Sequence, residues 1–370
     1  MKLLLETPLN SLSFGNVSYN LIKEFQRLDV ELGLFPTGGN VDLAAFDIGE
    51  NLKEYIQNAI NERWSFVDKE IPSLKLWHFN GSENRKNKDQ HLFTFYECSE
   101  PTKIEKATCA VQDSTIFSST YAKDMFEKEG CDNTHFIPLG FDEEFKRTDR
   151  KYLKDIVHFG LMGKFENRKH TKKIIQTWLS KYGNDPKYQL SCCINNPFFK
   201  PEQMHGVWQD ITKGKNYNNL NIIPHLAKNA EVNELLNAID IDLTGLSGGE
   251  GWNLPAFNAT CLGKWSIVLN ETSHKDWATK DNCILVESTG RSVPSADGMF
   301  FTKGSDYNQG DFYAWDEETV LKAMEEAETK VGQINTEGVK LGDSMTYKKT
   351  AEAILALIFK GNQTGTSCVK

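Results

Sequence analysis

One carboxylate, Glu250, stands in a glycine-rich segment that runs from Ser247 to Gly251. A short alternating run at 239–244 precedes the segment, and Pro255 follows it near the start of a predicted helix. A glycine-rich turn between a strand and a helix is how α/β proteins expose reactive groups at the carboxyl end of a strand. Glu250 is therefore predicted to be the centre of a ligand site.

A second candidate segment is strongly basic. Lys164 and Lys169 are five residues apart, where an apolar run at 156–163 gives way to a predicted helix over 171–179. Both ammonium groups could converge on one diphosphate, and backbone N–H groups at the helix start would add to the attraction. A solvated, basic helix start is the alternative interpretation, and the motif alone does not decide between them.

Further candidates lie in the first hundred residues. A glycine-bearing loop ends near Gly15, and the helix predicted from Asn16 onward follows it, so the loop either offers N–H groups to an anion or is a plain strand-to-helix turn. His78 and Glu97 stand at the ends of two predicted strands, where ligands bind in parallel α/β sheets. For His78, a structural histidine at the rim is the alternative.

Size and composition restrict the class of protein. With 370 residues, the chain suits two domains, and a net charge of -9 argues against a general nucleic-acid binder. No run approaches the roughly 20 apolar residues of a membrane span, and the apolar start at 1–5 is too short for a signal peptide. The eight cysteines lack metal-binding spacing, which predicts reduced thiols, and the lack of a membrane span or signal peptide predicts a cytoplasmic protein.

The elements that must position these residues alternate between strand and helix, and the pattern occurs twice. This predicts two doubly wound parallel α/β domains, at 1–148 and 149–344, joined by a charge-dense linker at 143–154. A last amphipathic helix at about 345–360 is expected to pack back on the first domain, and 361–370 to form a flexible tail. The predicted strands are 3–5, 74–79, 91–96, one ending at 118–120, 134–142, 156–163, 188–194, 220–223, 239–244 and 265–269; the other predicted helices are 49–63, 121–129 and 231–238.

The two candidate segments together carry a family resemblance. Gly163-Lys164-Phe165-Glu166-Asn167-Arg168-Lys169, followed by Ser247-Gly248-Gly249-Glu250-Gly251-Trp252-Asn253-Leu254-Pro255, resembles the signature pair of retaining glycosyltransferases with the GT-B architecture (family 4-like, group 1). The segments 14–17, 118–130 and 137–142 also resemble family motifs, and all occur in the family's order within residues 1–290. The resemblance implies two Rossmann-like domains that face each other across a cleft.

The resemblance also implies roles for individual residues. Lys164 and Lys169 match the basic pair that neutralises the donor diphosphate, and Glu250 matches the glutamate that faces the donor sugar. These three are the predicted catalytic residues, because stabilising developing charge is commonly the largest catalytic term. The remaining predictions are donor-binding residues Gly249, Gly251, Trp252, Asn253, Leu254, Asn258 and Arg168, and acceptor-side residues Gly15, Asn16, His78 and Glu97.

Two positions depart from the family pattern. Asn258 stands where the family has a second glutamate that binds the nucleotide ribose, and Asn253 stands where it usually has glycine. An asparagine amide can still bond a ribose hydroxyl, but the bond is neutral and weaker. The affinity for the donor, or the choice of nucleotide, is therefore open.

The predicted function is transfer of a sugar from a nucleotide-diphosphate donor, with UDP- or GDP-sugar favoured, to an acceptor hydroxyl. The resemblance implies retention by front-face attack without a metal or cofactor, and leaves the acceptor open among glycans, lipids, small molecules, proteins and modified nucleic acids. Asp240 and Asp242 are interpreted as structural, and His274 and Lys275 as a surface loop or, alternatively, donor contacts. Rival functions are a non-catalytic sugar-nucleotide-binding subunit, which Asn258 favours, and another GT-B enzyme such as a phosphorylase or epimerase.

Overall fold

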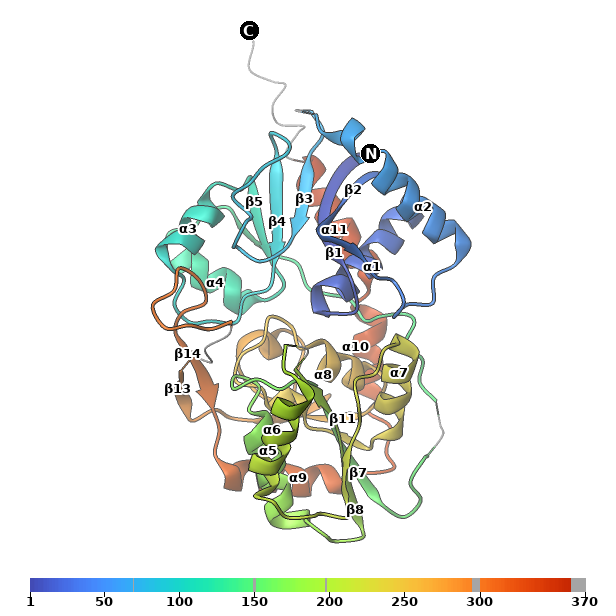
Figure 1. The fold of residues 1–370 in the computed structure, drawn as a ribbon, viewed down its shortest axis with the longest axis vertical. Coiled ribbons are helices and arrows are strands. Elements are labelled where there is room, and N and C mark those ends of the chain that lie inside the picture. The colour runs from blue at the N-terminus through green and yellow to red at the C-terminus, as the bar shows by residue number, and fades with distance from the viewer. Residues whose placement is uncertain (69, 149–150, 197, 295–299, 361–370) are drawn as a thin grey trace. The chain divides into compact units, whose positions relative to one another are not determined.

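The computed structural model describes residues 1–68, 70–148, 151–196, 198–294 and 300–360, and these form two compact units (Figure 1). Unit 1 comprises Met1–Tyr96, Pro101–Asp142 and the described residues from Met345 onward. Unit 2 comprises Glu97–Glu100 and the described part of Glu143–Ser344. The predicted tail at 361–370, and residues 149 and 150 of the predicted linker, lie outside the described residues.

Unit 1 contains a parallel six-stranded sheet of strand order β2-β1-β3-β4-β5-β6. Successive strands along the chain are added on one side of β1 and then, from β3 onward, on its other side. The sheet is therefore doubly wound and has its switch point between β1 and β3. The strands are β1 (Lys2–Leu9), β2 (Glu31–Val41), β3 (Ser73–Leu76), β4 (Gln90–Thr94), β5 (Ser114–Phe117) and β6 (Thr134–Phe136); the helices are α1 (Ser13–Arg27), α2 (Glu50–Asn61), the 3-10 turn η1 (Arg63–Phe66), α3 (Lys103–Ala110), α4 (Thr120–Lys128) and α11 (Tyr347–Lys360).

The last helix, α11, belongs to unit 1 although it is last in sequence. It contacts α1, and Thr350 Oγ1 donates to the Pro138 carbonyl at 2.8 Å. A bridge also pairs Phe141 with Thr346. Gly140 permits this close approach, because a Cβ there would lie 2.0 Å from the Tyr347 nitrogen.

Unit 2 contains a second parallel six-stranded sheet, of strand order β12-β11-β10-β7-β8-β9. Read from β9, this is the order 3-2-1-4-5-6 of Rossmann domains, with its switch point between β7 and β10. The strands are β7 (Val157–Lys164), β8 (Tyr188–Asn195), β9 (Leu220–Ile222), β10 (Ile241–Asp242), β11 (Trp265–Leu269), β12 (Cys283–Val286) and the antiparallel pair β13 (Gly290–Pro294) and β14 (Asp311–Ala314). The helices are α5 (Thr171–Tyr182), α6 (Pro201–Thr212), α7 (Asn229–Ala238), α8 (Leu254–Cys261), α9 (Glu317–Glu328) and α10 (Thr336–Ser344), with 3-10 turns η2 (Thr244–Leu246) and η3 (Thr272–Asp276).

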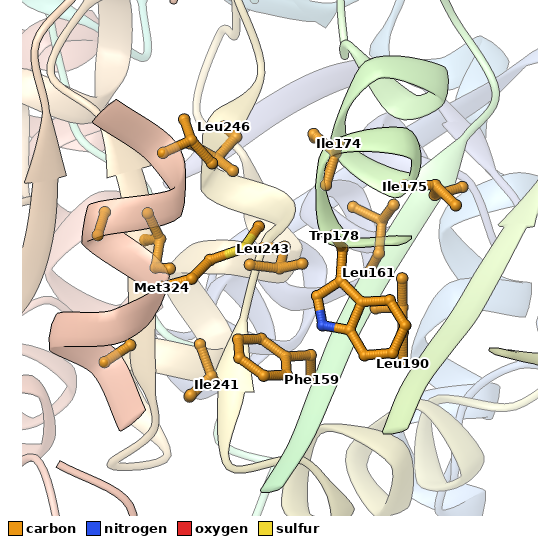
Figure 2. Close-up of a cluster of buried hydrophobic side chains, with 14 of the residues drawn as sticks. Phe159, Leu161, Ile174, Ile175, Trp178, Leu190, Ile241, Leu243, Leu246 and Met324 are labelled. Carbon is orange, nitrogen blue, oxygen red and sulfur yellow. The ribbon is translucent and has the colours of Figure 1, made fainter. Parts of the chain in front are cut away.

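The core of unit 2 lies between its sheet and helices α5 and α9. Figure 2 shows Trp178 of α5 beside Phe159 of β7, and Met324 of α9 beside Leu243 after β10; none of these four side chains is measurably exposed. Continuous apolar runs suit strands that are buried on both faces. The core therefore fixes the ends of β7 and β10, from which the candidate residues emerge.

Several elements differ from the sequence-based expectation. β6 is shorter than the predicted strand 134–142, and Gly15 lies inside α1 rather than in the loop before it. The sequence pattern also missed β2, α3, α6, β12, β13, β14, α9 and α10. β2 includes Pro36 and three glycine residues, which are residues that depress the strand signal.

Candidate functional site

The predicted catalytic residues lie at the switch point of the unit 2 sheet. Lys164 is the last residue of β7, and Glu250 lies in the segment that follows β10 and η2. These two strands are neighbours in the sheet and run parallel. Ligands of open α/β sheets bind in the crevice beyond the carboxyl ends of such strands.

A network of ion pairs joins the two predicted motifs. Lys169 Nζ lies 2.5 Å from Glu250 Oε1, and Arg168 Nη1 lies 3.1 Å from Glu250 Oε2. Lys164 Nζ lies 2.9 Å from Glu166 Oε1, and Glu166 Oε2 lies 2.9 Å from Arg168 Nε. Both predicted lysines and the predicted glutamate therefore belong to one connected cluster.

Glu250 is ionised in this cluster although it is buried, with 5% of the residue exposed. Burial by itself raises the pKa of Glu250, but the nearby Lys169 and Arg168 cations outweigh it and hold the pKa well below its usual value. Glu250 can therefore accept hydrogen bonds and stabilise positive charge, and it is poorly suited to donate a proton as a general acid.

The glycine-rich segment is held by backbone bonds. Gly248 N donates to the Arg168 carbonyl at 2.8 Å, and Tyr313 N of β14 donates to the Gly248 carbonyl at 2.9 Å. A Cβ on Gly249 would lie 2.6 Å from the Phe312 ring. The glycines thus allow β14 and the basic segment to approach the chain beside Glu250.

The backbone conformation of Asn253 explains why asparagine can stand where the family usually has glycine. Its φ is 70°, in the left-handed region where glycine and asparagine are the favoured residues. Its side-chain Nδ2 donates to the Thr244 carbonyl at 3.0 Å and lies 3.0 Å from His274 Nε2. The substitution therefore keeps the backbone turn and adds hydrogen bonds.

His274 is interior, so the surface-loop interpretation is wrong. The residue is 0% exposed, and its Nδ1 lies 2.8 Å from the Leu269 carbonyl. Burial lowers the pKa of His274 to about 4. A neutral ring that donates from Nδ1 to Leu269 and accepts at Nε2 from Asn253 satisfies both contacts. Lys275 instead pairs with Glu271 at 2.5 Å.

The other predicted donor-binding residues surround Glu250 in the chain. Trp252 is buried, and its carbonyl accepts from Trp277 Nε1 at 3.1 Å. Asn258 is also buried, in α8, and its Oδ1 has no hydrogen-bond partner among the described residues. Gly251 precedes Trp252 and is buried, and Leu254 begins α8 and is half-buried.

Three of the four predicted acceptor-side residues lie in unit 1, at the switch point between β1 and β3. Gly15 lies in the first turn of α1, where a Cβ would be 2.0 Å from the Asn10 carbonyl oxygen. Asn16 Nδ2 donates to the Ser11 carbonyl at 2.8 Å. The exposed His78 ring lies edge-on to Phe14, with 4.6 Å between the centroids.

The fourth, Glu97, belongs to unit 2, within the short segment Glu97–Glu100. Its Oε1 lies 3.5 Å from Arg168 Nε. Burial raises the pKa of Glu97. The same segment is fixed to β14 because Asp311 N donates to Ser99 Oγ at 2.8 Å.

Two residues of the site had escaped the sequence-based prediction. Glu166 bridges Lys164 and Arg168, and Thr272 Oγ1 accepts from Glu250 N at 3.3 Å. Glu166 lies inside the basic motif, and its position as an acid among cations was the sequence signal that could have identified it as a site residue. Thr272 has a φ of 53°, which sequence spacing does not reveal.

Asp242 fits the structural interpretation made from the sequence. It is fully buried in β10 and accepts from the Thr244 hydroxyl at 2.6 Å. Burial raises its pKa to about 6. Asp240 accepts from His158 N at 3.0 Å and so ties the start of β7 to the residue just before β10.

Neither a metal-binding cluster nor a membrane-spanning helix occurs among the described residues. No group of three or more His, Cys, Asp or Glu side chains within the described ranges is arranged to hold a metal ion. No helix in the part of the chain that the structure describes has the length and apolar character needed to span a membrane.

Comparison with known proteins was made by sequence and by structure. No protein-family model and no curated protein sequence matches the chain. The fold resembles sucrose-phosphate synthase from Thermosynechococcus elongatus, with 12% identity, a TM-score of 0.68 and coverage of 99% of this chain and 100% of that one. A glycosyltransferase from Rickettsia africae has 10% identity, a TM-score of 0.65 and 99% coverage of both chains.

A third similar structure is Anabaena HepE in complex with UDP-glucose, with 14% identity, a TM-score of 0.58 and 98% coverage of both chains. At these identities the likeness concerns the fold. The chain has the GT-B fold of these proteins, with two parallel six-stranded α/β sheets, as the sequence predicted.

Proposed function

We propose that the protein is a glycosyltransferase that moves a sugar from a nucleotide-diphosphate donor to an acceptor hydroxyl with retention of configuration. The observation that carries the proposal is the Lys169–Glu250 pair, at 2.5 Å, at the switch point of a Rossmann-like sheet. Lys164 ends the neighbouring strand β7 in the same ion cluster. A diphosphate and the sugar it carries need cations and a hydrogen-bond acceptor at one place.

In the proposed reaction the anomeric C–O bond to the diphosphate breaks, and the acceptor oxygen forms the new bond on the same face of the sugar. The acceptor's proton passes to an oxygen of the departing diphosphate. Lys164 and Lys169 neutralise the charge that grows on this leaving group. Glu250, held ionised by its two cations, accepts hydrogen bonds from the sugar and stabilises the positive charge that develops on it.

The ribose is assigned to Asn258. Its buried Oδ1 lacks a partner among the described residues, and a ribose hydroxyl would supply one. UDP is the favoured nucleotide, since HepE with the same fold holds UDP-glucose. The diphosphate is held by lysines, and we propose that catalysis needs no metal and no cofactor.

The free thiols of the seven described cysteines support the predicted cytoplasmic location. The principal rival function is a non-catalytic subunit that binds a sugar nucleotide. Asn258 favours this rival, because a neutral amide binds a ribose hydroxyl more weakly than the carboxylate that the family has at this position.

Hydrolysis of a panel of UDP-, GDP- and ADP-sugars, followed by released nucleotide, tests the proposal. We expect turnover by the wild type with at least one donor and a loss of about 100-fold or more in both Glu250→Ala and Lys169→Ala. Turnover that both variants retain would refute the assigned site. Binding of a nucleotide, seen as a raised melting temperature, without turnover of any donor would support the rival.

A further inference from the structure

Arg168 was predicted to bind the donor, but its surroundings indicate another role. We propose that Arg168 is a positioning residue that fixes the Glu250 carboxylate and the glycine-rich segment around it. The inference rests on the proposed function, in which Glu250 faces the donor sugar.

The guanidinium of Arg168 makes one hydrogen bond, through Nη1, and lies in ion-pair contact with three carboxylates; its Nε has no hydrogen-bond partner among the described residues. Its Nη1 donates to the Gly249 carbonyl at 2.6 Å and lies 3.1 Å from Glu250 Oε2. Its Nε lies 2.9 Å from Glu166 Oε2 and 3.5 Å from Glu97 Oε1. Only 9% of the residue is exposed. The planar fork of an arginine can serve several oxygens in fixed directions, which the single ammonium of a lysine cannot.

The backbone of Arg168 holds the same segment as its side chain. Its carbonyl accepts from Gly248 N at 2.8 Å, while its guanidinium holds the carbonyl of the next residue, Gly249. One residue of the basic motif thus holds the backbone of two consecutive residues, Gly248 and Gly249, and the carboxylate of the residue that follows them. Glu250 is oriented from both sides, by Arg168 at Oε2 and by Lys169 at Oε1.

Charge balance gives Arg168 a second task. It lies in contact with three carboxylates, those of Glu97, Glu166 and Glu250. Carboxylates gathered in a buried place repel one another and resist ionisation unless a cation lies among them. The Arg168 guanidinium therefore helps to keep Glu250 both ionised and in place, and leaves the more exposed Lys164, whose side chain is 35% exposed, for the donor.

The first test needs no ligand. A double-mutant cycle of Arg168→Lys and Glu250→Gln, measured by urea unfolding, compares the two single variants with the double variant. We expect a clearly non-additive result, because after either change the contact between the two side chains has already been lost. Additive shifts in the urea midpoint would overturn the proposal, whatever the catalytic activity. Arg168→Lys keeps a buried cation and is chosen to fold.

The second test separates positioning from donor binding. For the donor that the wild type turns over, we expect Arg168→Ala to lower kcat by about 100-fold while the Kd of the free nucleoside diphosphate changes less than threefold. Guanidinium ion at 10–50 mM, below denaturing concentration, should restore kcat at least tenfold in Arg168→Ala and leave Lys169→Ala unaffected. Arg85→Ala, whose partner is Asp113 at 3.1 Å in unit 1, serves as a surface control.

The outcomes distinguish the two proposals. If Arg168→Ala weakens binding of the nucleoside diphosphate as much as it lowers kcat, Arg168 is a donor ligand and the positioning role is wrong. If kcat is unchanged, the role is also wrong. If the wild type turns over no donor, the proposed function fails, while the stability cycle still decides whether Arg168 holds Glu250.

Discussion

The two sheets each have a switch point, and the residues gathered there differ in kind. At the switch point of unit 2, three cations and three carboxylates form one connected cluster around Arg168. At that of unit 1, Phe14 stacks on Phe95 with centroids 4.4 Å apart, and the edge of His78 meets Phe14. Here Asn16 Nδ2 donates to the backbone carbonyls of Ser11 and Leu12.

This difference fits the division of labour that we propose. A diphosphate is the same charged group in every nucleotide-sugar donor, so its recognition needs cations in fixed places. We expect an acceptor to be bound through contacts that differ from one acceptor to another, and the resemblance implies that Gly15, Asn16 and His78 of unit 1 lie on the acceptor side. The predictions below test this contrast, beginning with the largest effect.

Glu250→Gln is expected to lower kcat by about 100- to 1,000-fold, because an amide of the same shape cannot stabilise developing positive charge. His78→Ala, at the other switch point, should lower kcat/KM by about tenfold or less through the acceptor KM, since it removes one ring contact. Steady-state kinetics with saturating donor and varied acceptor measure both. Equal losses in kcat would erase the contrast between the two regions.

Two glycines test whether each switch point is tightly packed. A Cβ on Gly248 would lie 2.3 Å from the Tyr313 carbonyl oxygen, and one on Gly15 would lie 2.0 Å from the Asn10 carbonyl oxygen. Each change to alanine is expected to lower the free energy of unfolding by about 2–3 kcal/mol. Urea denaturation monitored by circular dichroism measures it.

Gly206 in α6 supplies the control, because a Cβ there meets no atom within 4 Å. Gly206→Ala should raise the unfolding free energy by about 0.5–1 kcal/mol, since alanine has less freedom to lose in a helix. If the Gly15→Ala protein instead has normal stability but no longer transfers sugar to an acceptor, Gly15 would belong to an anion-binding loop, as one interpretation of the sequence had it.

The sequence located the candidate motifs of unit 2 beside its strands, although it missed helices α6, α9 and α10 of the same unit. The end of β7 follows an apolar run and β10 lies in a short alternating one, and the glycine and lysine spacing that follows them depends on local chain geometry. Two of the three carboxylates that contact Arg168, those of Glu97 and Glu250, come from chain segments more than 70 residues away on either side, so no local pattern indicates them. Burial of His274 likewise results from the packing of η3 against Asn253 and could not be read from its polar neighbours.

His274 makes this burial measurable through pH. Its folded pKa of about 4 lies below the usual 6.5, so the unfolded chain binds the proton more readily. The stability that this residue contributes is complete above pH 6.5 and is lost as the pH falls toward 4.

Between pH 7 and pH 5, His274→Gln should remove about 2 kcal/mol from the pH-dependent loss of unfolding free energy. Urea unfolding of the two proteins at both pH values gives the comparison. Identical pH dependence in the wild type and His274→Gln would show that this histidine is accessible to protons in the folded state.

The last prediction concerns Glu166, whose replacement is expected to strengthen donor binding. Lys164 is already paired with Glu166 at 2.9 Å, so an arriving diphosphate must compete with that carboxylate and also meets its repulsion. Glu166→Gln removes one negative charge a few ångströms from the diphosphate, which is worth about 1 kcal/mol where water screens the interaction. The Kd of UDP, by calorimetry, should therefore fall by roughly fivefold, and the gain should shrink in high salt. Glu50→Gln, at an exposed pair with Lys53 in unit 1, should leave this Kd unchanged. Weaker binding of UDP to Glu166→Gln would mean that Glu166 holds Lys164 in place for the donor rather than competing with it.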